Sequence, residues 1–430
     1  MHRESHLEEL LMRLFVGKRP LLHTLLFGRS AMLLRQSRRL ITSTVIGLAA
    51  LFVAQPVWAA PYTWVGLSTG TSAWNGANNW LPATLPTAGT NSLFFTGSNR
   101  LTNQATVNYN IDGITFTSGA QSFNLQGNSS TRTLNMFGDI TNQSGLLQTI
   151  GGTAAGTKLV LAYGTSSTTR TINTGSGTID LNAQINGGDN VTLVKAGAGT
   201  LILDNPPGTG HGFSGTLRVD SGTMSLQATI PANVVVSSSA TLNVDPAAGG
   251  ITSATVNSLT SSGTVNMLGS LTVNQALTLN STSVVNFTLP EDPNVTTVLG
   301  YGSGSTFGGT LNASLLGTYP NADIFNPVTF TILQQQAGAP SGSFNAVNAT
   351  YDGQTLSFAQ GLDPTDPQKW VSTSTTNGQY LTFNQLTGEM VVVPEPSTVV
   401  FAGIGAAMAG WHMLKERRRR RLAARPRFEV

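Results

Sequence analysis

The chain has 430 residues, a formal net charge of +3 at pH 7 and no cysteine. It therefore has no disulfide, no thiol nucleophile and no cysteine-based metal site, and a chain of this length buries a large core without crosslinks. Residues 1–59 and 394–430 each carry +5 and residues 60–393 carry −7, which excludes binding of nucleic acid by the middle of the chain through charge.

The first segment, residues 1–59, is typical of a secretory signal peptide with an extended basic n-region. A pair of arginines precedes an apolar stretch at 40–53, and small residues close the segment. We expect export through the Sec translocon and cleavage after Ala59, which makes Ala60 the first exported residue. Two start sites stay open, Met1 and Met32.

Residues 60–112 are rich in tryptophan, glycine and asparagine, and they predict a cap on the repetitive region that follows. The prediction depends on Trp64, Trp74 and Trp80. The terminal repeats of a solenoid need a cover, which buried tryptophan rings would supply. Alternatively, exposed tryptophans stack on sugar rings, so these three residues are also candidate glycan contacts.

Most of the chain between residues 92 and 320 consists of short runs in which apolar and polar residues alternate. This two-residue period predicts strands with one buried face, and glycine, serine or asparagine bounds each run. The expected strands are Ser92–Thr96, Gly113–Thr117, Lys158–Ala162, Gly177–Leu181, Gly199–Leu203, Gly215–Val219, Ala240–Val244 and Ser270–Val273.

A pair made of glycine or alanine followed by threonine recurs before apolar residues. Its threonines are Thr178, Thr200, Thr216, Thr223, Thr241, Thr264 and Thr310. Several intervals, one of them 18, are near 16–22 residues, about one rung of a β-solenoid, although others are 7 and 46. We predict an all-β protein with a right-handed parallel β-helix, or β-solenoid, over 113–320, in which stacked threonines and asparagines line the turns. A β-sandwich is the rival fold, because turn spacing alone does not exclude it.

Two neighbouring stretches resemble the autotransporter-associated β-strand repeat. Residues 193–203 read Leu-Val-Lys-Ala-Gly-Ala-Gly-Thr-Leu-Ile-Leu, and residues 213–224 read Phe-Ser-Gly-Thr-Leu-Arg-Val-Asp-Ser-Gly-Thr-Met. In that family the lysine and glycines, which here begin at Lys195, start one rung, and the second Gly-Thr pair closes it. The loop between the stretches departs from the family pattern, with two prolines at 206–207 and with His211. The resemblance implies a β-helix of the passenger type.

Residues 321–393 predict a C-terminal β cap and a linker. Asp352 and Gly353 are typical of a tight hairpin turn. Two further runs, Tyr380–Phe383 and Gly388–Val393, predict a last hairpin.

Residues 394–430 predict a targeting signal rather than an enzymatic activity. The motif Pro394, Glu395 and Pro396 precedes an apolar run at 399–414. A basic cluster follows, made of Lys415, Arg417, Arg418, Arg419, Arg420 and Arg421. The apolar run makes roughly 24 Å of helix, which predicts one C-terminal transmembrane helix once the arginines snorkel. The basic cluster is expected on the cytoplasmic face.

In their order and position these three parts resemble the PEP-CTERM sorting signal of Gram-negative bacteria. The resemblance implies anchoring in the inner membrane, processing by an exosortase at or near the motif, and delivery to the cell surface or extracellular matrix. It also implies an association with exopolysaccharide, as in a biofilm. An ordinary single-pass C-terminal anchor is the alternative.

Candidate catalytic residues are few, and we predict no enzyme activity, no cofactor and no metal site. His211 is the one histidine in residues 60–393, and we expect it on the surface rather than acting as a base. The pairs Arg132/Arg170 and Asp180/Asp220 have spacings that suit alignment two rungs apart, which we attribute to chance. Acidic residues lack the spacing of a recognised calcium loop.

Three functions agree with these patterns. The first is an exported structural or adhesive protein of the cell surface or matrix, whose outer rows of threonine, asparagine and serine contact polysaccharide or neighbouring cells. The second is a polysaccharide lyase or hydrolase on the same scaffold, which needs two carboxylates about 5 to 10 Å apart. The third is an autotransporter-type adhesin passenger, which is disfavoured because an apolar segment and arginines follow, rather than several hundred residues of β-barrel.

Overall fold

The structure is a computed structural model. It describes residues 60–86, 89–152, 158–204, 210–292, 297–317, 319, 327–362, 366, 368–394, 408 and 411–417. The expected signal peptide, Glu395, Pro396 and the arginines at 418–421 lie outside the described residues. The described part consists mainly of β-strands in three sheets, with one 3-10 turn, η1 (Ala77–Asn79), and helical residues at 408 and 411–417.

We name the sheets A, B and C. Sheet A contains β1 (Ala60–Trp64), β2 (Trp80–Leu81), β3 (Thr90–Gly97), β5 (Tyr109–Ala120), β7 (Arg132–Met136), β8 (Ile140–Asn142), β10 (Leu159–Ala162), β11 (Thr168–Asn173), β13 (Gln184–Gly187), β14 (Val191–Ala196), β16 (Gly212–Phe213), β17 (Thr216–Val219), β19 (Asn233–Val236), β22 (Ser258–Ser261), β25 (Leu277–Leu279), β28 (Thr306–Phe307) and β32 (Ser341–Gly342). Sheet C contains β21 (Ser253–Val256), β24 (Ser270–Val273), β27 (Leu299–Tyr301) and β31 (Leu333–Gln335).

Sheet B runs beside them and ends in an antiparallel part. Its strands are β4 (Thr102–Ala105), β6 (Asn124–Gly127), β9 (Leu147–Ile150), β12 (Thr178–Leu181), β15 (Thr200–Leu203), β18 (Gly222–Leu226), β20 (Ala240–Val244), β23 (Thr264–Met267), β26 (Val284–Leu289), β29 (Thr310–Leu315), β33 (Ala346–Tyr351), β34 (Gln354–Gln360), β35 (Lys369–Ser372), β36 (Gln379–Asn384), β37 (Glu389–Pro394) and β30 (Val328–Thr331). Each of the eight strands expected from the sequence lies within a strand of the structure or overlaps it.

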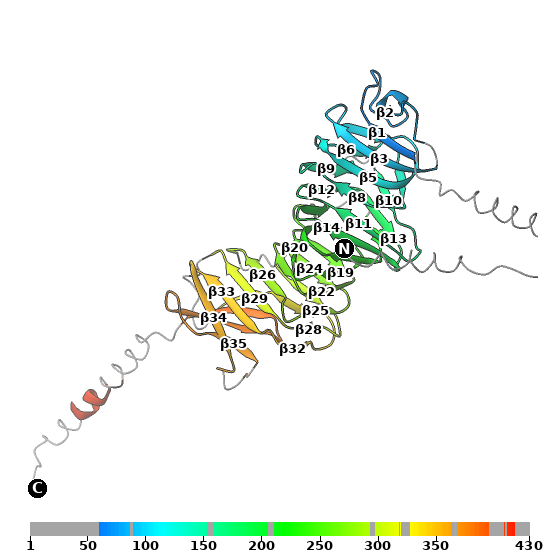
Figure 1. The fold of residues 1–430 in the computed structure, drawn as a ribbon. Coiled ribbons are helices and arrows are strands. Elements are labelled where there is room, and N and C mark those ends of the chain that lie inside the picture. Colours follow the sequence, from blue (N-terminus) through cyan, green and yellow to red (C-terminus); the bar gives the residue numbers. More distant parts are fainter. Residues whose placement is uncertain are drawn as a thin grey trace, which may run out of the picture. The chain divides into compact units, whose positions relative to one another are not determined.

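Parallel pairing between successive coils of the chain organises the three sheets. In sheet B, β12 pairs in parallel with β9 before it and with β15 after it, and β15 pairs with β18. In sheet A, β14 pairs in the same way with β11 and β17. Figure 1 shows the strands stacked in chain order, from β1 and β2 at one end to β33, β34 and β35 at the other. This is the arrangement of a β-solenoid, and a sandwich of antiparallel sheets is wrong for the described part.

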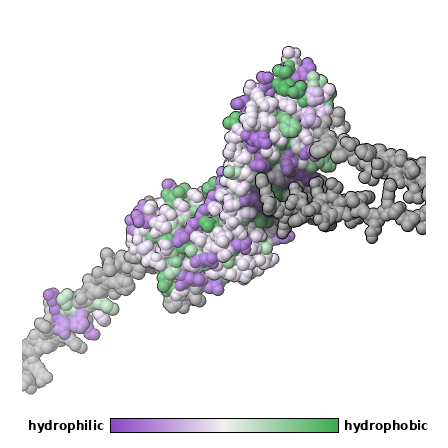
Figure 2. All heavy atoms as spheres, viewed as in Figure 1, coloured by the Kyte–Doolittle hydropathy of each residue, from purple (hydrophilic) through white to green (hydrophobic). Residues whose placement is uncertain are grey.

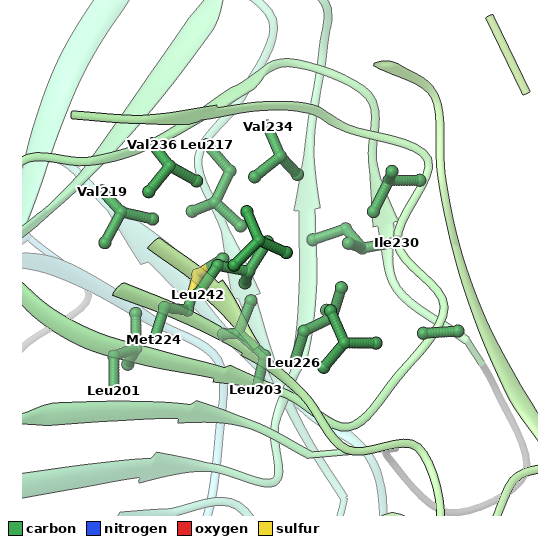
Figure 3. Packing of buried hydrophobic residues seen from close by; sticks show 14 of the residues in the cluster. Leu201, Leu203, Leu217, Val219, Met224, Leu226, Ile230, Val234, Val236 and Leu242 are labelled. Carbon is green, nitrogen blue, oxygen red and sulfur yellow. The ribbon is translucent and has the colours of Figure 1, made fainter. Parts of the chain in front are cut away.

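The core lies between the inner faces of the sheets. Alternate residues of each strand point inward, so that Leu203 and Leu226 of sheet B face Leu217 and Val234 of sheet A across the core (Figure 3). These four side chains are at most 1% exposed, and burial of each stabilises the fold by about 1.5–3 kcal/mol. The two-residue period predicted from the sequence is therefore the period of core packing.

A cluster of tryptophans closes the N-terminal end of the stack. Trp80 packs edge-on against Trp64 and Trp74, with ring centroids 5.0 and 5.7 Å apart. The indole nitrogen of Trp74 donates to Asn103 Oδ1 at 2.7 Å, and that of Trp80 donates to the carbonyl oxygen of Trp74 at 2.9 Å. Strand β2 pairs with β1 in antiparallel fashion, so the terminal strand is paired and the core beneath it is covered.

The C-terminal end is an antiparallel sheet. Parallel stacking extends past residue 320, through β33, and antiparallel pairing begins at β34. Asp352 and Gly353 have φ of 48° and 72° and form the predicted tight turn between β33 and β34. The predicted last hairpin is β36 with β37.

Little of the C-terminal tail is described. Residues 411–417 are helical, and the Lys415 ammonium lies 5.5 Å from the centre of the Trp411 ring. Among the described residues there is no helix long and apolar enough to cross a membrane. The expected span at 399–414 lies mostly outside them.

Candidate functional site

The outer face of sheet B carries a column of threonines. Five of the repeated threonines, at 178, 200, 223, 241 and 264, are in register on consecutive strands from β12 to β23. Val284 takes the next place in the column and Thr310 the one after it. The expectation that stacked threonines line the turns is therefore wrong, because they lie on a strand face. These side chains are partly exposed, while the residues between them point into the core.

A ladder of asparagines runs beside the threonine column, two residues further along each strand. Its members are Asn243, Asn266, Asn286, Asn312 and Asn348, which are in register on β20, β23, β26, β29 and β33. From Asn266 onward, the Nδ2 of each member donates to Oδ1 of the preceding asparagine, at 2.8, 2.8, 2.8 and 3.0 Å. The ladder uses one amide N–H and one acceptor site of each inner member, and these partly exposed side chains keep their remaining donor and acceptor capacity for other partners.

This ladder was not predicted from the sequence, although a signal for it is present there. Thr-Leu-Asn at 241–243 and 310–312 and Thr-Val-Asn at 264–266 place an asparagine two residues after a repeated threonine. Side chains two residues apart share one face of a strand. Once the threonines are assigned to one column, the asparagines follow as a second column.

The outer surface is weakly polar and mixed. Figure 2 shows hydrophilic and hydrophobic residues scattered among intermediate ones on the face that it presents, without a broad field of either kind. An ion pair joins Arg218 and Asp220 at 2.8 Å. Contacts made by this surface therefore depend on hydroxyl and amide groups more than on charge.

An acidic pair stands further along the same face of sheet B. Burial and the charge of Asp204 raise the pKa of Asp180 to about 6. Asp180 Oδ2 accepts a hydrogen bond from Asn182 at 3.0 Å, and its Oδ1 is buried without a hydrogen-bond partner. The alignment of Asp180 with Asp220 that their spacing would suit does not occur, because Asp180 lies on β12 of sheet B and Asp220 follows β17 of sheet A.

His211 is buried, so the expectation of a surface histidine is wrong. It is 6% exposed, its Nδ1 accepts from the Ile185 N–H at 3.2 Å, and its Nε2 lies 3.1 Å from the carbonyl oxygen of Asp204. A ring that accepts at Nδ1 and donates at Nε2 is neutral. Burial lowers the pKa of His211 to about 4. The ring links adjacent coils, and its two nitrogens are occupied by backbone partners.

Lys195, which begins the repeat resemblance, points into the stack and is fully buried. Its Nζ donates to the carbonyl oxygens of Ala196, Gly197 and Ser221 at 3.0, 2.7 and 2.9 Å. Burial lowers the pKa of Lys195 to about 8, whereas the three acceptors favour the ammonium form. The ammonium therefore joins the turn after β14 to the turn after β17 in the next coil.

The other candidates from the sequence lie apart. Trp64, Trp74 and Trp80 are 0%, 0% and 1% exposed, so none of them offers a ring face to a sugar. Arg132 and Arg170 are not aligned, since β7 pairs with β10 whereas β11 pairs with β14. No group of three or more histidine, aspartate and glutamate side chains in the described part is placed to hold a metal ion.

The folded β part reaches the expected sorting motif. Strand β37 continues to Pro394 and pairs there with Gln379 of β36. The strand begins at Glu389, whose backbone pairs with Thr331 of β30 and Asn384 of β36. The first residue of the motif is thus the last residue of a paired strand.

Comparisons with known proteins add no assignment. No protein-family model, no curated protein and no solved structure matches the chain.

Proposed function

We propose that the chain is an exported structural or adhesive protein of the cell surface or extracellular matrix, sorted through Pro394, Glu395 and Pro396 and associated with exopolysaccharide. The observation that carries the proposal is the order of motif, apolar run and arginine cluster in residues 394–421. An exosortase would act at the motif, and the apolar run would hold the chain in the inner membrane as one transmembrane helix until then.

The position of the motif supports this order of events. Strand β37 ends at Pro394, and β1 begins at Ala60, the expected first residue after signal-peptide cleavage. Cuts at these two places would separate both basic tails from the paired strands without removing a strand. The released part would carry the net charge of −7 found in residues 60–393.

The outer face of sheet B supports contact with a repetitive polymer. Strands in a sheet lie about 4.7–4.9 Å apart, so the threonine column and the asparagine ladder repeat hydroxyl and amide groups at that spacing. Repeated weak contacts gain strength together when one chain spans many of them. The coil is proposed to be right-handed, as are nearly all parallel crossover connections.

A polysaccharide hydrolase is the second candidate, favoured by the raised pKa of Asp180 beside Asp204. A carboxyl that holds its proton near pH 6 is suited to act as a general acid. Release of reducing ends from a polysaccharide panel, lost in Asp180→Asn, would support this candidate. No release from any member of the panel would exclude it for those substrates.

The sorting proposal is tested by the intact mass of the protein recovered from the surface of its native host. We expect a species that starts at Ala60 and ends between Pro394 and Thr398. Glu395→Ala should accumulate in the membrane fraction with its tail attached, whereas the control Glu389→Ala, within β37, should be processed normally. A surface species that retains Lys415 and the arginines after it would overturn the proposal.

A further inference from the structure

One corner of the stack has a longer connection than the corners on either side of it. Residues 163–167 join β10 to β11, whereas residues 137–139 join β7 to β8, and residues 188–190 join β13 to β14. Strand β10 pairs with β7 and β13, and β11 pairs with β8 and β14, so these connections are neighbours in the stack. The middle connection has two extra residues, and a hollow of about 280 Å³ opens beside it.

We call this hollow the corner pocket. Its lining residues are Asn135, Met136, Phe137, Ala162, Tyr163, Gly164, Thr165, Ser166, Thr168 and Arg170. They come from the end of β7 and the residue after it, the end of β10, the longer connection and the start of β11. The volume is near the lower end of the roughly 300–1,000 Å³ range of small-molecule sites, which suits one monosaccharide unit.

Two polar atoms in the wall have no hydrogen-bond partner. The Tyr163 hydroxyl and Arg170 Nε are both buried and unpaired. The whole of Tyr163 is 4% exposed. Arg170 uses Nη1 to donate to the Thr169 carbonyl oxygen at 3.1 Å. Buried polar groups are rarely left without partners, because an unmade hydrogen bond costs free energy. A ligand in the pocket with hydroxyl groups would supply the missing partners.

The same corner has a negative charge near the pocket and an aromatic ring in the pocket lining. Asp139 Oδ1 accepts from the Thr171 N–H at 2.7 Å, and Asp139 lies close enough to Tyr163 for its charge to act on that hydroxyl, against the opposite effect of Arg170. Phe137 is 51% exposed, and in the described β part it is the one phenylalanine or tryptophan among the exposed large hydrophobic residues. The positive charge of Arg170 and the negative charge of Asp139 are therefore balanced near the exposed aromatic ring of Phe137.

We propose that the corner pocket binds one pyranose unit of a neutral polysaccharide. The ring of Phe137 would face the C–H groups of the sugar. Arg170 would donate to a sugar hydroxyl, and the Tyr163 hydroxyl would donate to another or accept from it. The balance of charge at the corner, together with the −7 of residues 60–393, disfavours an acidic sugar. This proposal deepens the association with exopolysaccharide proposed above and rests on it for the choice of a polysaccharide.

The test is binding of glucose hexamers to the purified full chain in mild detergent, measured by isothermal titration calorimetry. The probes are the β-1,4-, β-1,3- and α-1,4-linked hexamers, with an α-1,4-linked galacturonate hexamer as the acidic comparison. We expect at least one neutral hexamer to bind, and the dissociation constant to rise about tenfold or more in Phe137→Ala and Arg170→Gln. Tyr163→Phe should weaken binding by about five- to tenfold.

Matched controls separate a binding role from a structural one. Leu268 is exposed to the same 51% as Phe137, and Leu268→Ala should change the dissociation constant by less than about twofold. Arg218→Gln, which changes an exposed side chain elsewhere in sheet A, should likewise leave the dissociation constant within about twofold. Tyr163→Phe removes an unpaired hydroxyl, so this variant should melt no lower than the wild type.

Three results would overturn the proposal. They are no binding of any neutral hexamer, neutral binding that survives both Phe137→Ala and Arg170→Gln, and tighter binding of the galacturonate hexamer than of every neutral one. None of these results bears on processing at the motif, which the mass measurement tests separately. A failure of the corner pocket is thus distinguishable from a failure of the sorting proposal.

Discussion

The pH dependence of stability tests the two titratable groups near Asp204, the buried His211 and the partly buried Asp180. The folded pKa of His211, about 4, lies below its ordinary value of 6.5. Between these values the unfolded chain binds a proton that the folded chain does not, so the free energy of unfolding falls as pH decreases from about 6.5 to 4. A shift of this size is worth roughly 3 kcal/mol, which is present above pH 6.5 and lost at pH 4.

Asp180 acts in the opposite direction in the same range. Its folded pKa of about 6 lies above its ordinary value of 3.8, so the folded chain takes up a proton first, and the free energy of unfolding rises as pH decreases from 6 to 3.8. Because this side chain is partly open to solvent, the gain is discounted to roughly 1–2 kcal/mol. The two effects partly cancel in the wild type, and single substitutions are needed to separate them.

The assay is urea denaturation of the full chain at pH 7, 6, 5 and 4, for the wild type, His211→Gln and Asp180→Asn. Other carboxylates contribute alike to all three proteins and cancel in the differences. The wild type should lose roughly 3 kcal/mol relative to His211→Gln between pH 7 and 4, and it should gain roughly 1–2 kcal/mol relative to Asp180→Asn. If the difference from His211→Gln stays constant within about 0.5 kcal/mol over this range, the buried neutral ring is refuted.

Three further substitutions test the stack itself, each by denaturant unfolding. Asn266→Ala, inside the ladder, should cost about 1–2 kcal/mol and Asn348→Ala, at its end, about half as much; equal costs would argue against the ladder. Lys195→Met should cost about 2–4 kcal/mol, because three carbonyl oxygens lose a charged donor, whereas Arg218→Met should cost less than about 1 kcal/mol; the opposite order would contradict the role of the buried ammonium. Trp74→Ala should cost about 3–5 kcal/mol, and hydrogen exchange should show β1, β3 and β5 losing protection first; uniform loss along the stack would speak against a cap.

Local patterns predicted the strands and the hairpin turns well. Alternation over four or five residues reports which face of a strand is buried, and this information is complete within the run itself. The turn at Asp352 and Gly353 was predictable for the same reason, since both residues adopt positive φ, which asparagine, aspartate and glycine tolerate. Neither prediction requires knowledge of what packs on the segment.

Residues whose burial depends on a neighbouring coil were not predictable in this way. His211 is buried because Ile185, one coil earlier, brings an N–H to its ring. Tyr163 lies in a connection that is two residues longer than the connections stacked on it, Arg170 lies on the strand after it, and both border the hollow. Both features require the register between coils, which a single sequence does not state. The asparagine ladder was hidden for the same reason until the threonines were placed in one column.

The uneven spacing of the Gly-Thr and Ala-Thr pairs shows that residues in register on neighbouring strands need not be separated by a constant number of residues in the sequence. The interval of 7 arises because Thr216 lies on β17 of sheet A, while Thr223 belongs to the column on sheet B. The interval of 46 covers two coils, because Val284 occupies the intermediate place between Thr264 and Thr310. Inward apolar residues set the register on every strand, so the connections vary in length without disturbing the column. A stack built this way can change its outer corners, such as 163–167, while its core pairing stays the same, and it is at such a corner that we place the sugar site.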